Sequence, residues 1–225
     1  NVTHCEINPE LSKIVTHNYQ QLKIDTIKTF QTDGISYLNN SSKGYDWIYI
    51  DPSRRHESKG KVFFLKDCLP NVPEHLELLF QYSKNILIKT SPLLDFSIGI
   101  NELKHVKTIH VVAVNNEVKE LLWILEAGFN EQIYIETVNI KRDTSDYFSF
   151  NIENENALKS NYSEPRNYLY EPNSAILKAG GFKSISNQLE VIKLHKHSHL
   201  YTSNNLIDFP GRDFKIEYVI PYNKK

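Results

Sequence analysis

Short apolar runs alternate with stretches of helical periodicity through the first 140 residues of the chain. From Leu11 to Leu22 apolar residues recur at helical spacing, after an Asn8–Pro9 pair that is typical of a helix start. The run from Tyr45 to Ile50 is almost continuously apolar, as in strands that are buried on both faces. The pattern predicts strands at 2–6, 27–32, 45–50, 85–89, 108–114 and 132–140, and helices at 9–22, 35–38, 73–83, 93–103 and 117–126.

Strands that alternate with helices are typical of βαβ units, so we expect an α/β fold with a mostly parallel sheet over residues 1–142. Ligands of such sheets bind at the carboxyl ends of the strands. Glu6 ends one predicted strand, and Asp33 and Asp51 each follow the end of another. These three acidic residues are therefore the first candidates for a functional site.

The pattern changes after about residue 141. Residues 143–165 are polar and rich in Asn, Ser and Glu, which predicts a linker or a mobile loop. A helix at 173–186 and strands at 189–194 and 214–220 are expected beyond it. We therefore predict a second, small α+β domain over residues 143–225.

The composition is that of an ordinary globular protein, with 40% apolar and 24% charged residues. A net charge of -1 argues against a protein that coats nucleic acid without specificity. No run approaches the roughly 18 apolar residues of a membrane span, so no membrane partner is expected. The two cysteines, Cys5 and Cys68, cannot form a disulfide scaffold, which favours a reducing, cytoplasmic setting.

Glu6 and Asp33 occupy equivalent places at the ends of two successive predicted strands. A carboxylate at the position of Glu6, ahead of a helix, can accept both hydroxyls of a ribose. The alternative is a surface glutamate that the helix dipole stabilises. Asp33, with Gly34 beside it, repeats this placement where a carboxylate can meet an adenine amino group.

The segment Asp51-Pro52-Ser53-Arg54-Arg55 is the sharpest feature of the sequence. Because it follows a strongly apolar strand, Asp51 is expected at the ligand edge of the sheet, where it can orient or polarise a nucleophile. Pro52 fixes its own φ angle and leaves the preceding carbonyl free as an acceptor. Arg54 and Arg55 can fork onto a phosphate or a carboxylate. The alternative is a turn that carries a surface basic pair.

Over roughly residues 1–140, this order of acidic residues resembles the class I S-adenosylmethionine-dependent methyltransferases. The resemblance implies a Rossmann-like sheet and S-adenosylmethionine as the cofactor. It implies that Glu6 binds the ribose, that Asp33 and Gly34 lie at the adenine, and that Asp51 and Pro52 lie between cofactor and target. Asp51 then orients or deprotonates the nucleophile, while Arg54 and Arg55 hold a substrate phosphate or the loop.

Two departures from the family pattern change what is expected. Ser53 and Arg54 stand where amino-group methyltransferases have a proline and an aromatic residue, so oxygen, carbon and protein targets stay open. The family's first strand and glycine-rich loop are missing ahead of Glu6, and the sequence contains no Met. We therefore expect a sequence that starts inside its domain and binds S-adenosylmethionine poorly, the alternative being modified Met residues lost from the written sequence.

The second half carries a further resemblance. The segments 168–173, 178–180, 198–203 and 209–212 resemble the THUMP-like domain that follows some bacterial methyltransferases. Because THUMP domains bind RNA, the resemblance implies RNA as the substrate. Two other functions remain open: a catalytically inactive, methyltransferase-like scaffold that binds RNA, and a different nucleotide-binding α/β enzyme.

Three histidines, His195, His197 and His199, alternate along a predicted strand and would share one face of it. Imidazole groups suit zinc, copper, iron or nickel. No Asp, Glu or Cys lies near them in the sequence, so we expect a solvated or RNA-facing strand and no metal site.

Overall fold

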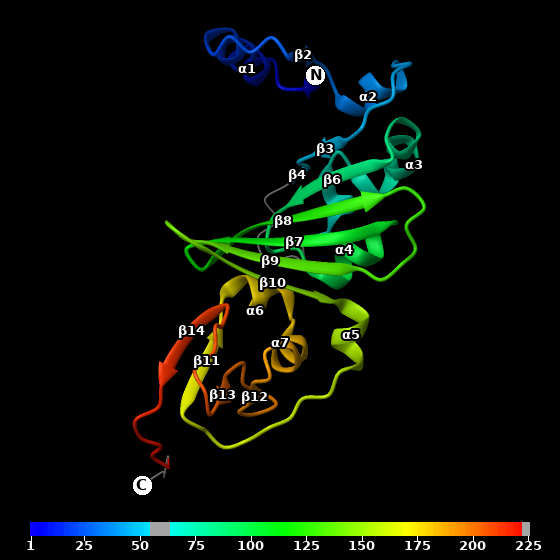
Figure 1. Ribbon diagram of the computed structural model, residues 1–225. Helices are drawn as coiled ribbons and strands as arrows, with labels where there is room; N and C mark the ends of the chain where they lie inside the picture. Colours follow the sequence, from blue (N-terminus) through cyan, green and yellow to red (C-terminus); the bar gives the residue numbers. More distant parts are fainter. Residues whose placement is uncertain (55–63, 222–225) are drawn as a thin grey trace.

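The computed structural model describes residues 1–54 and 64–221 and has a mixed α/β fold (Figure 1). β1 (Val2–Glu6) and β2 (Ile27–Gln31) form a parallel pair, and α1 (Pro9–Gln21) connects them. A six-stranded sheet follows, and a four-stranded sheet belongs to the carboxyl-terminal part. The expected α/β class with a small α+β unit at the carboxyl end is confirmed.

The six-stranded sheet has the order β10-β9-β7-β8-β6-β3. Its strands are β3 (Ile48–Ile50), β6 (Asn85–Thr90), β7 (Val106–Val114), β8 (Glu117–Glu126), β9 (Tyr134–Ile140) and β10 (Ser145–Asn151). β3 runs parallel to β6 and β7 runs parallel to β9, whereas the remaining pairs are antiparallel. The sheet is therefore mixed, and the expectation of a mostly parallel sheet is corrected.

The helix predicted at 117–126 is wrong, because these residues form β8. Leu121, Trp123 and Leu125 are fully buried, while the residues between them are partly exposed, which is the period of two of a strand. Asn115 and Asn116 both have positive φ angles, as a tight turn between two strands requires. β7 and β8 are consequently a hairpin rather than a strand and a helix.

Between β2 and β7, six further elements lie outside the six-stranded sheet. They are α2 (Gly34–Asn39), β4 (Ser53–Arg54), η1 (Leu65–Asp67), β5 (Cys68–Leu69), α3 (Val72–Tyr82) and α4 (Phe96–Glu102). α3 and α4 confirm the helices predicted at 73–83 and 93–103. β4 and β5 pair antiparallel and bracket residues 55–63, which lie outside the described part of the chain.

The predicted linker at 143–165 is also wrong over its first part, which forms β10 and α5 (Ile152–Ala157). β10 pairs with β9 at the edge of the main sheet, and its Phe148 and Phe150 are buried while Tyr147 and Ser149 are exposed. The sheet therefore continues beyond residue 143, while the domain boundary expected there remains a prediction.

The carboxyl-terminal unit is an antiparallel sheet, in the order β12-β13-β11-β14, with two short helices. Its elements are β11 (Tyr168–Pro172), α6 (Ser174–Ala179), α7 (Phe182–Gln188), β12 (Ile192–Lys193), β13 (Tyr201–Ser203) and β14 (Gly211–Lys215). The helix expected at 173–186 is interrupted, because Gly180 ends α6 in a left-handed conformation. The strand predicted at 189–194 is reduced to β12, and the strand predicted at 214–220 begins earlier, as β14. The sequence did not predict β13.

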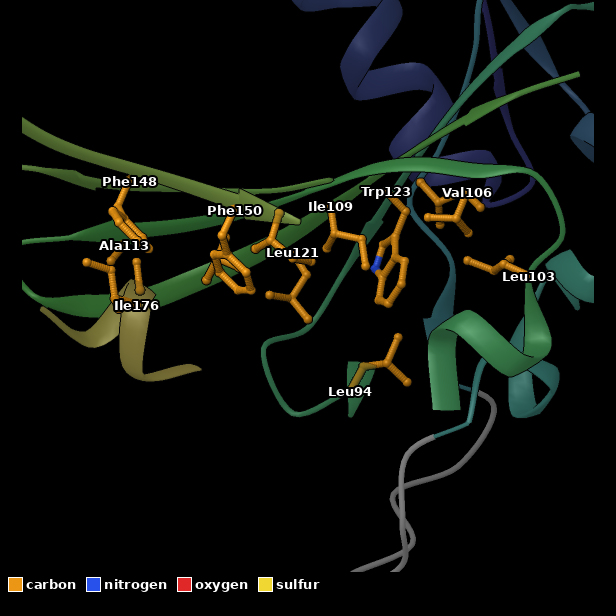
Figure 2. Close-up of a cluster of buried hydrophobic side chains, with 14 of the residues drawn as sticks. Leu94, Leu103, Val106, Ile109, Ala113, Leu121, Trp123, Phe148, Phe150 and Ile176 are labelled. Atoms are coloured by element: carbon orange, nitrogen blue, oxygen red, sulfur yellow. The ribbon is translucent and has the colours of Figure 1, made fainter. Parts of the chain in front are cut away.

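Trp123 fills the centre of the core beneath the main sheet (Figure 2). Its indole Nε1–H donates a hydrogen bond of 2.9 Å to the Thr90 hydroxyl of β6, and its ring meets Phe96 of α4 edge to face. Gly99 of α4 lies so close to this ring that a Cβ would overlap it, with Cζ2 of the indole only 2.6 Å away. Gly99 is therefore required by the close approach of α4 to β8.

Among the described residues, no helix has the length and apolar character that crossing a bilayer requires.

We expect Gly99→Ala to lower the free energy of unfolding by about 1–3 kcal/mol, because the ring of Trp123 is fully buried and cannot move aside. The expected destabilisation is opposite to the effect of helix propensity, which favours Ala over Gly by about 1 kcal/mol. Urea unfolding followed by Trp fluorescence measures the change.

The matched control is Gly44→Ala, whose Cβ would lie 3.6 Å from the carbonyl oxygen of Tyr82, an ordinary contact. We expect its effect to stay within about 0.5 kcal/mol. Equal unfolding midpoints for the two variants would contradict the packing argument.

Candidate functional site

The carboxyl end of β1 presents Glu6 next to the start of α1. An Oε1 atom of Glu6 accepts a hydrogen bond of 2.7 Å from the backbone N–H of Asn8. Asn8 in turn caps α1 through its side chain, which accepts from the N–H groups of Glu10 and Leu11. These contacts fix the position of the Glu6 carboxylate at the strand end, where the sequence predicts a ribose ligand.

Asp33 follows β2 and caps α2, because its Oδ1 accepts a hydrogen bond of 2.8 Å from the N–H of Ser36. The backbone N–H of Thr32 donates to the carbonyl of Glu6, so the two strand ends lie side by side. Gly34 faces Cys5 of β1, whose pKa is raised by burial and by the charge of Asp33. The structure thus brings Glu6, Asp33 and Gly34 to one edge.

Asp51 lies at the carboxyl end of β3, on a different sheet from Glu6 and Asp33. Its Oδ2 is 2.8 Å from Nζ of Lys89, and the same ammonium is 3.5 Å from Oε1 of Glu120. The hydrogen bond with Asp51 raises the pKa of Lys89 and outweighs its partial burial. Tyr49 lies next to this group, and its pKa is raised by burial and then by Asp51.

The sequence does not single out Lys89 and Glu120. Lys89 is the one charged residue of β6 and directly follows three apolar residues, at 86–88, and this interruption is the signal that could have identified it. Glu120 was hidden by the wrong prediction of a helix at 117–126. A carboxylate, an ammonium and a second carboxylate therefore meet where the sequence predicts only Asp51.

The remaining residues of the Asp51 segment are only partly described. Pro52 leads into β4, where the Ser53 hydroxyl contacts the carbonyl of Leu69 at 3.4 Å. The backbone of Arg54 belongs to β4 and pairs with Cys68. Arg55 lies outside the described residues, so the expected forked contacts of both arginines remain predictions.

The two groups of acidic residues are separate in this structure. In residues 1–54 and 64–221, no hydrogen bond or ion pair connects Glu6 or Asp33 with Asp51. Figure 1 shows β1, β2 and α1 apart from the main sheet, with α2 leading toward β3. The carboxylates of Glu6 and Asp33 are hydrogen-bond acceptors, the kind of group that binds hydroxyl and amino groups of a ligand.

The three histidines do not share a strand face, because they lie in the loop between β12 and β13. His199 stacks on Phe182 with ring centroids 3.9 Å apart, and burial and then Lys193 lower its pKa. His195 and His197 lie 5.4 Å apart by ring centroids. Over the described part of the chain, no group of three or more His, Cys, Asp or Glu residues could hold a metal ion.

Comparison with known proteins finds one match to a short segment of the chain and others to most of its length. Residues 168–210 match a family described as a ferredoxin-like domain. No curated protein matches the chain. Two solved structures of low similarity are a "modification subunit of a putative type I restriction enzyme" from Vibrio vulnificus YJ016 and a type I R-M system. They share 13% and 10% identity, cover 72% and 61% of this chain and 45% and 33% of theirs, and have TM-scores of 0.43 and 0.40.

A much stronger similarity exists to the crystal structure of a "putative methyltransferase" from Porphyromonas gingivalis W83. The two share 33% identity with a TM-score of 0.87, and the match covers 98% of this chain. It covers 56% of the other chain, so the sequence spans little more than half the length of that protein. The fold and the sequence of this chain are therefore similar, nearly from end to end, to part of a protein named as a methyltransferase.

Proposed function

We propose that the chain is part of an S-adenosylmethionine-dependent methyltransferase that acts on RNA. The observation that carries this proposal is the similarity to the Porphyromonas gingivalis protein over 98% of the chain at 33% identity. The acidic residues at the strand ends add to it, because Glu6, Asp33 and Asp51 lie where an α/β sheet binds its ligands.

When bound, S-adenosylmethionine supplies an electrophilic methyl group on a sulfonium. The residues of the chain then mainly hold and orient the reactants, which is a proximity effect. The Glu6 carboxylate accepts hydrogen bonds from the ribose hydroxyls, and the Asp33 carboxylate accepts a hydrogen bond from the adenine amino group. Asp51 orients the nucleophile and accepts its proton, and Arg54 and Arg55 hold a substrate phosphate.

RNA as the substrate rests on the carboxyl-terminal unit and its THUMP-like sequence segments. This unit contacts the loop that follows β6, where Lys178 of α6 donates a hydrogen bond of 3.0 Å to the carbonyl of Leu94. Ser174 donates its backbone N–H to the side chain of Asn116 in the β7–β8 turn. The unit is thus held against the loop that follows the strand of Lys89.

A catalytically inactive scaffold that binds RNA is the second candidate. It is favoured by the fact that the three carboxylates already have protein partners: Asn8 for Glu6, Ser36 for Asp33 and Lys89 for Asp51. Such a scaffold binds RNA with an affinity that falls as salt rises and transfers no methyl group. Incubation of the full-length gene product with labelled S-adenosylmethionine and total bacterial RNA separates the two functions.

Calorimetric titration of S-adenosylmethionine tests the cofactor. We expect the full-length product of the gene to bind with a Kd of about micromolar. In the full-length protein, Glu6→Ala should weaken binding by about tenfold or more, because a hydrogen bond to a charged acceptor contributes about 1.5–3 kcal/mol.

Glu10→Ala is the matched control, since Glu10 is an exposed carboxylate that pairs with Lys13 in the first turn of α1. We expect it to leave the affinity unchanged. Absence of binding by the full-length protein would argue against the methyltransferase and leave the scaffold.

Asp51→Ala in the full-length protein should abolish methyl transfer to RNA and leave S-adenosylmethionine affinity nearly unchanged, because Asp51 acts on the nucleophile. Turnover with labelled cofactor and calorimetric titration measure the two effects. The control is Asp46→Ala, because Asp46 precedes the same strand at its other end and contacts Ser83 and Asn85 only through its backbone carbonyl. Turnover of the Asp51 variant equal to that of the unsubstituted protein would refute its role.

A further inference from the structure

We propose that Lys89 is the positioning residue that holds the Asp51 carboxylate in place for the nucleophile, an inference that rests on the proposed methyltransferase function. Lys89 lies on β6, next to β3, which ends one residue before Asp51, and the sequence pattern assigns Lys89 no role.

The strand register accounts for this contact. β3 and β6 run parallel, and Ile50 at the end of β3 lies opposite Ile88. Asp51 and Lys89 are the next residues along the two chains, and their side chains meet at 2.8 Å. Side chains alternate between the faces of a sheet, and Ile88 and Thr90 are buried on the core face. Lys89 therefore points to the opposite face, together with Asp51.

The ammonium is held from two sides. It lies 2.8 Å from Oδ2 of Asp51 and 3.5 Å from Oε1 of Glu120, which projects from β8 on the same face. The Lys89 side chain is 27% exposed, against 51% for Asp51 and 44% for Glu120. The cation is thus the most enclosed member of the group, while the Asp51 carboxylate stays open to a ligand.

This arrangement differs from an ordinary surface ion pair. Exposed pairs hold two long, freely moving side chains and contribute little to stability. Here the second carboxylate of Glu120 fixes the ammonium, and the ammonium fixes the short side chain of Asp51. A charged hydrogen-bond donor in a defined position restricts the direction in which Asp51 presents its remaining acceptor sites.

The experiment compares Lys89→Met and Lys89→Arg in the full-length gene product, with labelled S-adenosylmethionine and total bacterial RNA. We expect Lys89→Met to lower kcat by about a hundredfold, the effect of a misplaced catalytic group, with KM for S-adenosylmethionine unchanged. Lys89→Arg retains a cation between the two carboxylates and should restore most of kcat. Thermal unfolding of each variant shows that the fold is intact.

The matched control is Lys119→Met, which removes another lysine of the same sheet whose ammonium lies 2.7 Å from Glu117. We expect it to leave kcat unchanged. A kcat for Lys89→Met equal to that of the unsubstituted protein, or equal losses for the Lys89 and Lys119 variants, would overturn the role of Lys89.

Two further outcomes are decisive. If Lys89→Met unfolds at a lower temperature, folded Lys89→Arg decides the question, since a hundredfold loss in that variant as well overturns the role of a cation here. Absence of methyl transfer by the unsubstituted protein overturns the proposed function, and the role of Lys89 with it. Methyl transfer by the unsubstituted protein, with an equal kcat in Lys89→Met, overturns the role of Lys89 alone.

Discussion

The hydrogen bond between the Trp123 indole and the Thr90 hydroxyl, enclosed by Gly99, is the contact on which the main sheet depends. It joins β8 to β6, and Phe96 and Gly99 of α4 pack against the same indole ring. Because Thr90 must face the core to receive this bond, its neighbour Lys89 must face the other side of the sheet. The packing of one apolar ring thereby decides where the charged group around Asp51 is built.

The carboxyl-terminal unit extends the same buried layer. Ile176 of α6 lies against Ala113 and Phe148, and Figure 2 shows this group continuing the row of side chains that passes through Leu121 and Trp123. Two polar contacts fix the unit at the rim, through Lys178 and Ser174. The ferredoxin-like unit is thus attached to the sheet by its own core rather than by a free linker.

Local signals in the sequence were sufficient for much of the fold. Asn8 with Pro9 marks the start of α1, and the apolar runs mark β1, β2, β3 and β6. The local signals failed at β8, because the apolar residues around Trp123 fit both the helical and the strand period. Pairing with β6 and β7 decides that this segment is a strand. The local signals also failed at β10 because most of the strand is polar and its buried apolar residues are Phe148 and Phe150 alone.

In the candidate site, too, local signals predict some features and strand pairing decides the others. Each acidic residue could be predicted from its place after a strand, since that needs only local pattern. The contacts of Asp51 with Lys89 and Glu120 could not be predicted, because they depend on the register between β3 and β6 and on the hairpin that sets β8 beside β6. Nonlocal pairing therefore determines the electrostatic surroundings of a residue that the sequence can only locate.

The pairing of β1 with β2 gives the two parts of the candidate site different supports. Glu6 and Asp33 are held by contacts at the starts of α1 and α2, whereas the surroundings of Asp51 depend on the register of β3 with β6. A ligand that contacts all three carboxylates would bridge two separate sheets. Its binding would therefore couple the position of β1 and β2 to that of β3.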